Sequence, residues 1–164
     1  MHESNFSNEL KKSCEVQGFF YYKIPDAFGM QRFSPPKPFD SFMICNGQVF
    51  CIENKLCTNL RSFPLKNIKL HQIEGLLKAQ SAGAHSFIFI NHRIKSENII
   101  FAIPHSDLIS GILTKYSTSI PFSDITDYCY VIERIKNPQG KGKIWDIINF
   151  IDDYETTVLP SHFV

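Results

Sequence analysis

The sequence predicts one α/β domain, an α+β mixed sheet flanked by helices, over residues 1–164. Three observations favour this class. Short apolar segments that suit strands alternate with longer segments in which apolar residues recur every three or four positions. An Asn-Gly dipeptide separates two of the strand segments. Hydrophobic residues make up 43% of the chain, which is enough to build a core.

The N-terminal part of the chain predicts a helix, a strand and a loop. The helix is expected over residues 7–17, because a Ser-Asn pair can cap its start and Gly18 ends it. The aromatic segment 19–24 suits a strand, which the following proline closes. Residues 26–37 contain one glycine and two prolines, so they predict a loop.

A β-hairpin is the clearest local prediction. Strands over residues 39–45 and 48–55 are joined by Asn46-Gly47, a dipeptide that tolerates the positive φ of a tight turn. A helix is then expected over residues 66–81. Its buried face is expected to carry Ile73, Leu76, Leu77 and Gln80.

The second half of the chain predicts two buried strands, a short helix, a further strand and a final helix. In order, these are expected over residues 85–91, 98–104, 106–113, 128–135 and 144–151. Ser106 is expected to cap the short helix. The final helix is expected to bury Ile144, Ile147, Ile148 and Ile151.

Several classes of protein do not fit the composition. No segment approaches the run of about 18 apolar residues that a membrane helix needs. The first residues lack the basic region and apolar run of a secretory signal. The five cysteines form no CxxC pair, which makes a disulfide framework or a zinc site a poor interpretation. We therefore expect a cytoplasmic protein that contacts no membrane.

The net charge of +1 hides an uneven distribution of charge. Residues 55–78 carry five basic side chains and one acidic one, and residues 132–143 carry four against one. The tail over residues 144–164 holds four acids and no Lys or Arg. Two basic blocks suit a face that meets a polyanion, and solvated surface charge is the alternative.

Two carboxylates and a lysine stand out on the predicted hairpin. Asp40 lies on the first strand, and Glu53 and Lys55 lie two residues apart on the second, therefore on one face. That strand is apolar on both faces, as internal strands are, so a Glu and a Lys there are costly unless they are paired or bind a cation. The grouping suits Mg²⁺-assisted phosphodiester hydrolysis, with the acids as oxygen ligands and Lys55 offsetting charge on the phosphorane. A surface Glu–Lys pair with an unrelated Asp is the alternative.

Longer motifs surround these three residues. FDSFMICNG begins at Phe39, IENK covers residues 52–55, SFPLKNI begins at Ser62 and HQIE covers residues 71–74. Together these motifs resemble the RecU family of Holliday-junction resolvases, which belongs to the PD-(D/E)xK nuclease superfamily. The resemblance weakens towards the C-terminus.

The resemblance implies a restriction-endonuclease-like core with a catalytic Mg²⁺, for which Mn²⁺ can substitute. It implies that Asp40 and Glu53 are metal ligands, that Gln72 is a further metal ligand or positions the attacking water, and that Lys55 stabilises the transition state. Position 72 lies beside the apolar face of the predicted helix, so its side chain is expected to point at the sheet. A buried glutamine that bonds only to backbone is the alternative.

Three features bear on how far the family pattern holds. Pro38 stands where the family has a threonine that contributes to the metal site. Residues 26–37 form a short loop in place of the long basic stalk that enters the junction in the family. Glu9, on the first helix, is either a further acid near the metal or an ordinary solvated residue.

Contacts with DNA are expected from the two basic blocks. Arg61, Lys66 and Lys69 follow the catalytic strand, where the amides of a helix start also favour phosphate. Lys141 and Lys143 lie in a glycine-containing segment that predicts a flexible basic loop, with a solvated turn as the alternative.

The resemblance implies a Mg²⁺-dependent, structure-selective DNA endonuclease that resolves four-way junctions. A homodimer is expected, because a two-fold symmetric junction needs paired nicks. Such a protein would work in the cytoplasm or in association with the nucleoid. A nuclease for duplex or flap DNA is the alternative within enzymes, and a non-catalytic DNA-binding relative is the alternative outside them.

Overall fold

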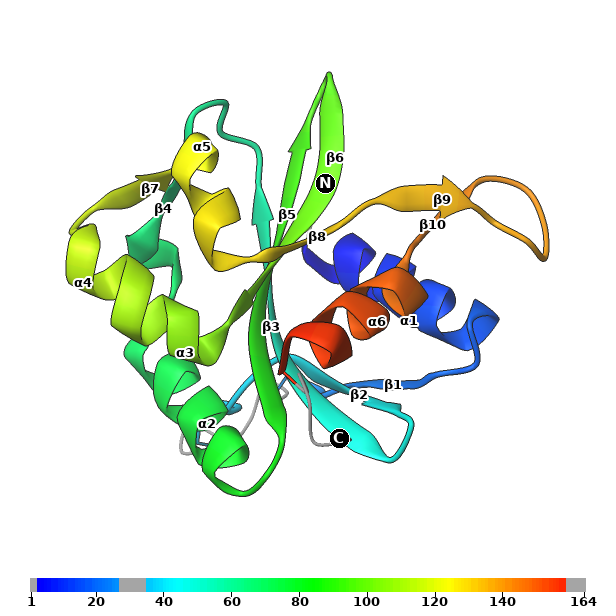
Figure 1. The fold of residues 1–164 in the computed structure, drawn as a ribbon, viewed down its shortest axis with the longest axis horizontal. Helices are drawn as coiled ribbons and strands as arrows, with labels where there is room; N and C mark the ends of the chain where they lie inside the picture. The colour runs from blue at the N-terminus through cyan, green and yellow to red at the C-terminus, as the bar shows by residue number, and fades with distance from the viewer. Residues whose placement is uncertain (1–2, 27–34, 159–164) are drawn as a thin grey trace.

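A mixed six-stranded sheet forms the centre of the computed structural model, which describes residues 3–26 and 35–158 (Figure 1). The strand order is β1-β2-β3-β5-β6-β8. Neighbouring strands are antiparallel except for β3 and β5, which are parallel. The strands are β1 (Phe20–Lys23), β2 (Ser41–Cys45), β3 (Gln48–Cys57), β5 (His85–Ile94), β6 (Glu97–Pro104) and β8 (Tyr130–Ile132).

Helices and two small sheets surround this central sheet. The helical elements are α1 (Glu3–Val16), the 3₁₀ turn η1 (Leu65–Asn67), α2 (Leu70–Ser81), α3 (His105–Asp107), the π-helical η2 (Leu108–Ile112), α4 (Leu113–Lys115), α5 (Phe122–Ile125), the 3₁₀ turn η3 (Thr126–Tyr128) and α6 (Ile147–Val158). The small sheets pair β4 (Ser62–Pro64) with β7 (Ser119–Pro121), and β9 (Arg134–Lys136) with β10 (Lys143–Trp145). Within the described residues, no helix is both long and apolar enough to cross a membrane.

The sheet separates two hydrophobic cores. Helices α1 and α6 cover one face, and α2 to α5 lie on the other side (Figure 1). Alternate residues of β3 serve the two cores, because successive side chains of a strand point to opposite faces. Phe50 and Ile52 pack under α1 and α6, whereas Cys51 and Cys57 join the core beneath α2. The predicted mixed sheet flanked by helices is confirmed, as is the internal position of β3.

The predicted hairpin is confirmed, but its strands cover Ser41–Cys45 and Gln48–Cys57, so Asp40 directly precedes β2 and does not lie on it as predicted. Asn46 and Gly47 both have positive φ, at 50° and 76°, and they join β2 to β3. The register pairs Ser41 with Ile52 and Cys45 with Gln48. This register follows from the two-residue turn, and it fixes which side chains of the two strands share a face.

Helix α2 differs from the prediction at its start and on its buried face. The segment 66–81 divides into the turn η1 and helix α2, which begins at Leu70. Leu76 is buried, but Leu77 is 51% exposed and Gln80 is also exposed. Gly75 and Leu76 are the buried residues of the helix, and Ile73 and Ala79 pack on the core only in part, so some of its apolar surface stays exposed.

The second half of the chain also departs from the prediction. Ser106 does not cap the short helix, since helical structure begins at His105 after Pro104 and no side-chain cap bond is present there. The predicted strand 128–135 divides into β8 and β9. Ile144 lies in β10 and not in α6, and Ile148 on α6 is 47% exposed. Of the predicted loop 26–37, residues 27–34 lie outside the described part of the chain.

Candidate active site

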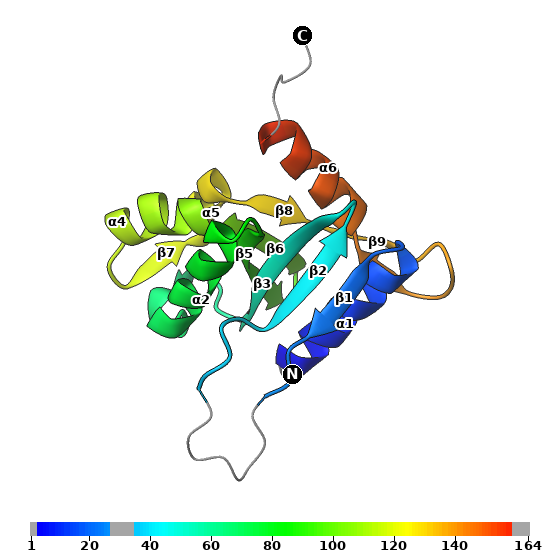
Figure 2. The same cartoon turned by 90° about the horizontal axis from the view of Figure 1, so that it is seen from below.

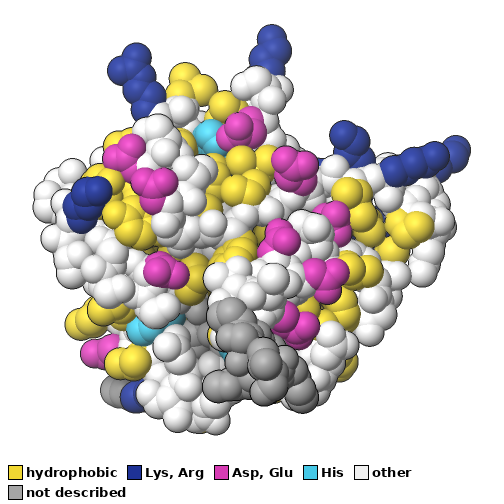
Figure 3. Space-filling view, viewed as in Figure 1, with side chains coloured by type: hydrophobic (Ala, Val, Ile, Leu, Met, Phe, Trp, Pro, Cys, Tyr) yellow, Lys and Arg dark blue, Asp and Glu magenta, His cyan; other side chains and the backbone are white. Residues whose placement is uncertain are grey.

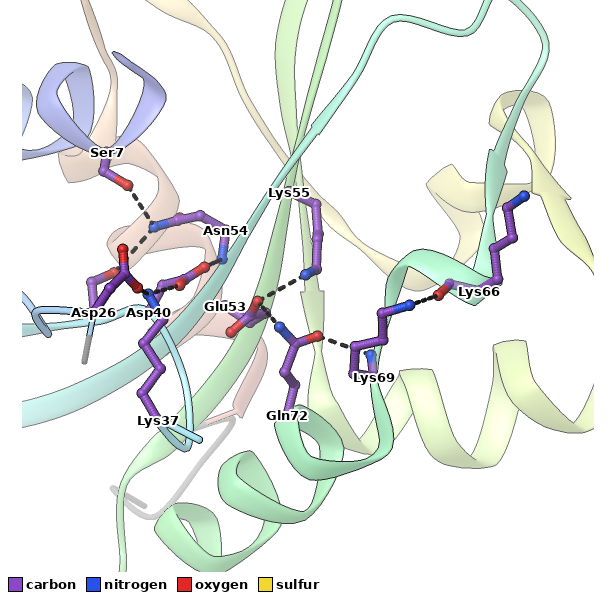
Figure 4. A network of polar contacts seen from close by, with 11 residues as sticks. Ser7, Asp26, Lys37, Asp40, Glu53, Asn54, Lys55, Lys66, Lys69 and Gln72 are labelled. Atoms are coloured by element: carbon purple, nitrogen blue, oxygen red, sulfur yellow. Dashed lines mark hydrogen bonds and ion pairs between the residues drawn. The ribbon is translucent and has the colours of Figure 1, made fainter. Parts of the chain in front are cut away.

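The predicted site residues come from two paired strands and one helix start. Glu53 and Lys55 lie on β3 and point to the face that α2 covers (Figure 4). Asp40 directly precedes β2, and its backbone N–H donates to the carbonyl of Ile52 at 3.2 Å. The register that pairs Ser41 with Ile52 places Asp40 opposite Glu53. Cross-strand neighbours of this kind share a face, so the hairpin brings the two carboxylates together.

Glu53 is buried and only partly satisfied. The residue is 1% exposed, and its Oε1 atom accepts hydrogen bonds from Lys55 Nζ at 2.9 Å and from Gln72 Nε2 at 2.5 Å. Its Oε2 atom is buried and has no hydrogen-bond partner among the described residues. A buried carboxylate oxygen normally has a partner. This unpaired oxygen fits a hard divalent cation, for which carboxylate oxygens are suitable ligands.

Asp40 is held by a backbone amide and by a second lysine. Its Oδ2 atom accepts the N–H of Asn54 at 3.0 Å, and its Oδ1 atom lies 2.7 Å from the ammonium of Lys37. Lys37 also pairs with Asp26 at 2.6 Å (Figure 4). The Asn54 amide turns the Asp40 carboxylate towards β3, the strand that carries Glu53.

Gln72 bridges the start of α2 to the site. Its Oε1 atom accepts the backbone N–H of Lys69 at 2.9 Å, which satisfies one of the free amides at the helix start. Its Nε2 atom donates to Glu53. The prediction that the Gln72 side chain points at the sheet is confirmed, because it reaches Glu53 on β3. Its role as a metal ligand stays a prediction, because here its oxygen bonds to Lys69.

The electrostatics of the site favour a bound cation. The pKa of the Glu53 carboxyl is raised from 4.5 to about 7. Burial is the main cause, and the negative charge of Asp40 and a hydrogen bond with its side chain add to it, while the charge and hydrogen bond of Lys55 act in the opposite direction. A divalent ion near both carboxylates would offset the effects of burial and of Asp40 on this pKa.

The side chain of Asn54 anchors β3 from the opposite face, as the alternation of a strand requires. Its Nδ2 atom lies 3.3 Å from Ser41 Oγ and 3.4 Å from both Ser7 Oγ and Tyr21 OH. These three hydroxyls come from β2, α1 and β1. The residue between Glu53 and Lys55 therefore ties β3 to three neighbouring elements.

Glu9 lies away from this site. It sits on α1, which covers the other face of the sheet, and its carboxylate forms a two-point ion pair with Arg93 at 2.6 and 3.2 Å. The structure therefore gives Glu9 a structural partner on β5. Neither prediction for Glu9 matches this ion pair: the residue is not a further acid near Glu53, and it is not an ordinary solvated residue of the helix.

The predicted DNA-contact residues fall into two groups. Arg61, Lys66 and Lys69 are exposed on the segment between β3 and α2, and Lys69 Nζ donates to the carbonyl of Lys66 beside Gln72 (Figure 4). Lys141 and Lys143 are exposed on the β9–β10 hairpin, across the sheet from α2 (Figure 1). In that hairpin the backbone N–H of Asn137 donates to the carbonyl of Gly142 at 3.0 Å, and both lysines lie on the exposed surface, as in the solvated turn given as the alternative.

Two residues near the site escaped the sequence analysis. Lys37 gives no motif, since only the fold brings its side chain to both Asp26 and Asp40. Gly75 allows the backbone of Pro38 to pack directly on α2, because a Cβ atom there would overlap the Pro38 carbonyl. Its position inside a predicted helix was the only signal, as a glycine there often marks close packing.

The fold and the family follow from comparisons with known proteins. The solved structure of Archaeoglobus fulgidus Hjc, a Holliday junction resolvase from an archaeal hyperthermophile, matches with a TM-score of 0.55 and 17% identity, over 77% of this chain and 93% of that chain. The chain therefore has a restriction-endonuclease-like fold.

Residues 32–142 of this chain match the family described as "RecU: Recombination protein U". The chain belongs to the RecU family. A Leuconostoc mesenteroides protein named Holliday junction resolvase RecU is 31% identical over 96 residues, which are 58% of this chain and 46% of the relative. The chain thus spans about half the length of this curated relative.

Proposed function

We propose that this protein is a Mg²⁺-dependent, structure-selective DNA endonuclease that resolves Holliday junctions by paired phosphodiester hydrolysis. The observation that carries the proposal is the meeting of Asp40, Glu53, Lys55 and Gln72, with one Glu53 oxygen buried and unpaired. Membership of the RecU family supports it, as does the name of the Leuconostoc relative.

Asp40 and Glu53 would hold the metal. They are opposite each other on paired strands, and the Oε2 atom of Glu53 lacks any other described partner. When bound, Mg²⁺ or Mn²⁺ supplies Lewis-acid stabilisation of charge on the phosphoryl oxygens. Gln72 orients Glu53 through its Nε2 atom and remains a candidate further ligand.

Lys55 acts beside the ion. Its side chain is fixed by the 2.9 Å bond to Glu53, and the residue is only 8% exposed. A preorganised ammonium in such a dry site stabilises negative charge that develops on the phosphorane, and it can hold the attacking water in line. This role depends on the positive charge and on the reach of the side chain.

DNA binding and assembly complete the proposal. Arg61, Lys66 and Lys69 would contact phosphates next to the cleaved bond, and Lys141 and Lys143 would contact a more distant part of the DNA. A single nuclease domain acting as a homodimer in the cytoplasm or nucleoid would present two sites to the two-fold symmetric junction. The short segment 26–37 favours one alternative, a nuclease for duplex or flap DNA.

The test is a nicking assay with a synthetic four-way junction and a linear duplex of the same sequence. We expect Mg²⁺-dependent nicking of the junction, and we expect Lys55→Ala to bind the junction but not cut it. Lys11→Ala, which removes an exposed lysine on α1, is the matched control and should cut normally. Equal cutting of both substrates would favour the duplex nuclease, and binding without cutting in Mg²⁺ or Mn²⁺ would favour a non-catalytic relative.

A further inference from the structure

Lys37 contacts an oxygen of Asp40, one of the two carboxylates proposed above to hold the metal. Its ammonium lies 2.7 Å from Oδ1 of Asp40, while the other oxygen of this carboxylate is bound to the Asn54 amide. The Asp40 side chain is 14% exposed, so little water competes with these two contacts. Both Asp40 oxygens are therefore engaged within the described residues.

A second carboxylate gives Lys37 an alternative partner. Asp26 lies 2.6 Å from the same ammonium and is 71% exposed. Burial lowers the pKa of Lys37, but the hydrogen bonds and the negative charges of Asp26 and Asp40 together leave this pKa raised, so Lys37 stays charged. Lys37 can leave Asp40 and still keep one ion pair.

The backbone around Lys37 is fixed close to the site. Pro38 packs against α2 at Gly75, with no room for a Cβ atom between them. Lys37 directly precedes this packed proline, so its backbone lies beside the site. Asp26 and Lys37 also lie on either side of residues 27–34 in the sequence.

We propose that Lys37 competes with the divalent ion for Asp40 and so sets the metal affinity of the site. An ion bound to Asp40 would lie about 2.1 Å from a carboxylate oxygen, close to an ammonium that contacts the same group. The two positive charges repel at this distance, so metal binding moves Lys37 towards Asp26 alone. Asp26 thereby favours the metal-bound arrangement. This inference rests on the proposed metal site.

Two substitutions with opposite expected effects test the inference. Lys37→Gln removes the competing charge and should bind Mn²⁺ about tenfold more tightly than the wild-type chain. Asp26→Asn leaves Asp40 as the one carboxylate partner of Lys37 among the described residues and should bind Mn²⁺ a few-fold more weakly. Lys37→Arg keeps the charge and should not gain affinity. The measurement is the free Mn²⁺ signal in electron paramagnetic resonance titrations without DNA, with thermal unfolding in EDTA to confirm that each variant folds.

The same titration separates this inference from the proposed function. Asp40→Asn should abolish tight Mn²⁺ binding, and unchanged binding in that variant would overturn both the metal site and the role of Lys37. Loss of binding in Asp40→Asn together with unchanged or weaker binding in Lys37→Gln would overturn the role of Lys37 alone.

Discussion

Glu53 shows at the scale of one residue how the site is suited to a cation. Its carboxyl group is buried beside Asp40, and the hydrogen bonds from Lys55 and Gln72 both reach the same oxygen. The remaining oxygen is left without a partner among the described residues, and the pKa is raised to about 7. Either a proton or a metal ion would satisfy this group.

This pKa predicts a pH-dependent stability in the absence of metal. Between pH 4.5 and about 7 the folded chain keeps a proton on Glu53 that the unfolded chain has lost, so the free energy of unfolding should fall as pH rises through this window. The difference corresponds to at most about 3 kcal/mol. Glu53→Gln has no such proton, and its stability relative to the wild type should therefore increase from pH 5 to pH 8.

Urea unfolding in EDTA at pH 5, 6, 7 and 8 measures this difference. Glu74→Gln removes an exposed acid on α2 and serves as the matched control, which should follow the wild-type curve. Parallel curves for the wild type and Glu53→Gln would contradict the account of Glu53.

The sequence predicted some of these residues and missed others for a physical reason. Glu53 and Lys55 follow from a two-residue strand period, and Asp40 follows from a turn whose register is set by Asn46-Gly47. Lys37 pairs with Asp40 three residues further along, in an irregular segment that has no periodic pattern. Glu9 pairs with Arg93, a residue of a distant strand, and no local pattern predicts that contact.

At the scale of elements, the site depends on how the segment before β2 packs on α2. Strand β3 carries two site residues, and Gln72 lies in the first turn of α2. The contact between Pro38 and Gly75 keeps these parts together. A small shift of α2 would therefore change the distance between Gln72 and Glu53 as well as the position of Asp40.

Gly75→Ala tests this packing. The added methyl group overlaps the backbone of Pro38, which cannot rotate away as a side chain would. We expect a loss of about 1–3 kcal/mol in the free energy of unfolding and a clear loss of junction cleavage. Gly140→Ala is the matched control, because a Cβ atom there meets only ordinary contacts and the stability should barely change. Equal stability of the two variants in urea would count against the role of Gly75.

Element boundaries were the least predictable feature. The mixed sheet and the hairpin follow from apolar pattern and turn chemistry. The pattern could not show that α2 uses only a narrow buried face, which leaves Leu77 half exposed. Nor could it show that Ile144 pairs with Ile135 in a second small sheet, since this pairing is set by tertiary packing.

At the scale of the whole molecule, charge is divided between regions. In the view of Figure 3, Lys and Arg side chains project at the margins, and acidic side chains gather where α6 lies. The sequence of α6 holds three acids and no Lys or Arg.

Seen from below, the strands β1, β2 and β3 lie in front, with α2 beside them (Figure 2). Because the β9–β10 hairpin lies across the sheet from α2, the basic residues near α2 and those on this hairpin are separate candidate contacts for DNA.

Salt dependence should distinguish these two groups. Each lost phosphate contact flattens the slope of log K against log salt by about 0.9. We expect the Lys66→Ala/Lys69→Ala pair to flatten this slope with both a junction and a linear duplex. The Lys141→Ala/Lys143→Ala pair should flatten it with the junction only, because the hairpin lies across the sheet from α2. Fluorescence anisotropy gives the slopes, and an unchanged slope removes that pair from the DNA interface.

The most direct test of the central claim is the position of the metal. Anomalous diffraction from crystals grown with Mn²⁺ locates the ion without reference to activity. The account predicts a peak within ligand distance, about 2.0–2.3 Å, of a carboxylate oxygen of both Asp40 and Glu53. An ion bound elsewhere, or one that contacts only one of these two carboxylates, would contradict it.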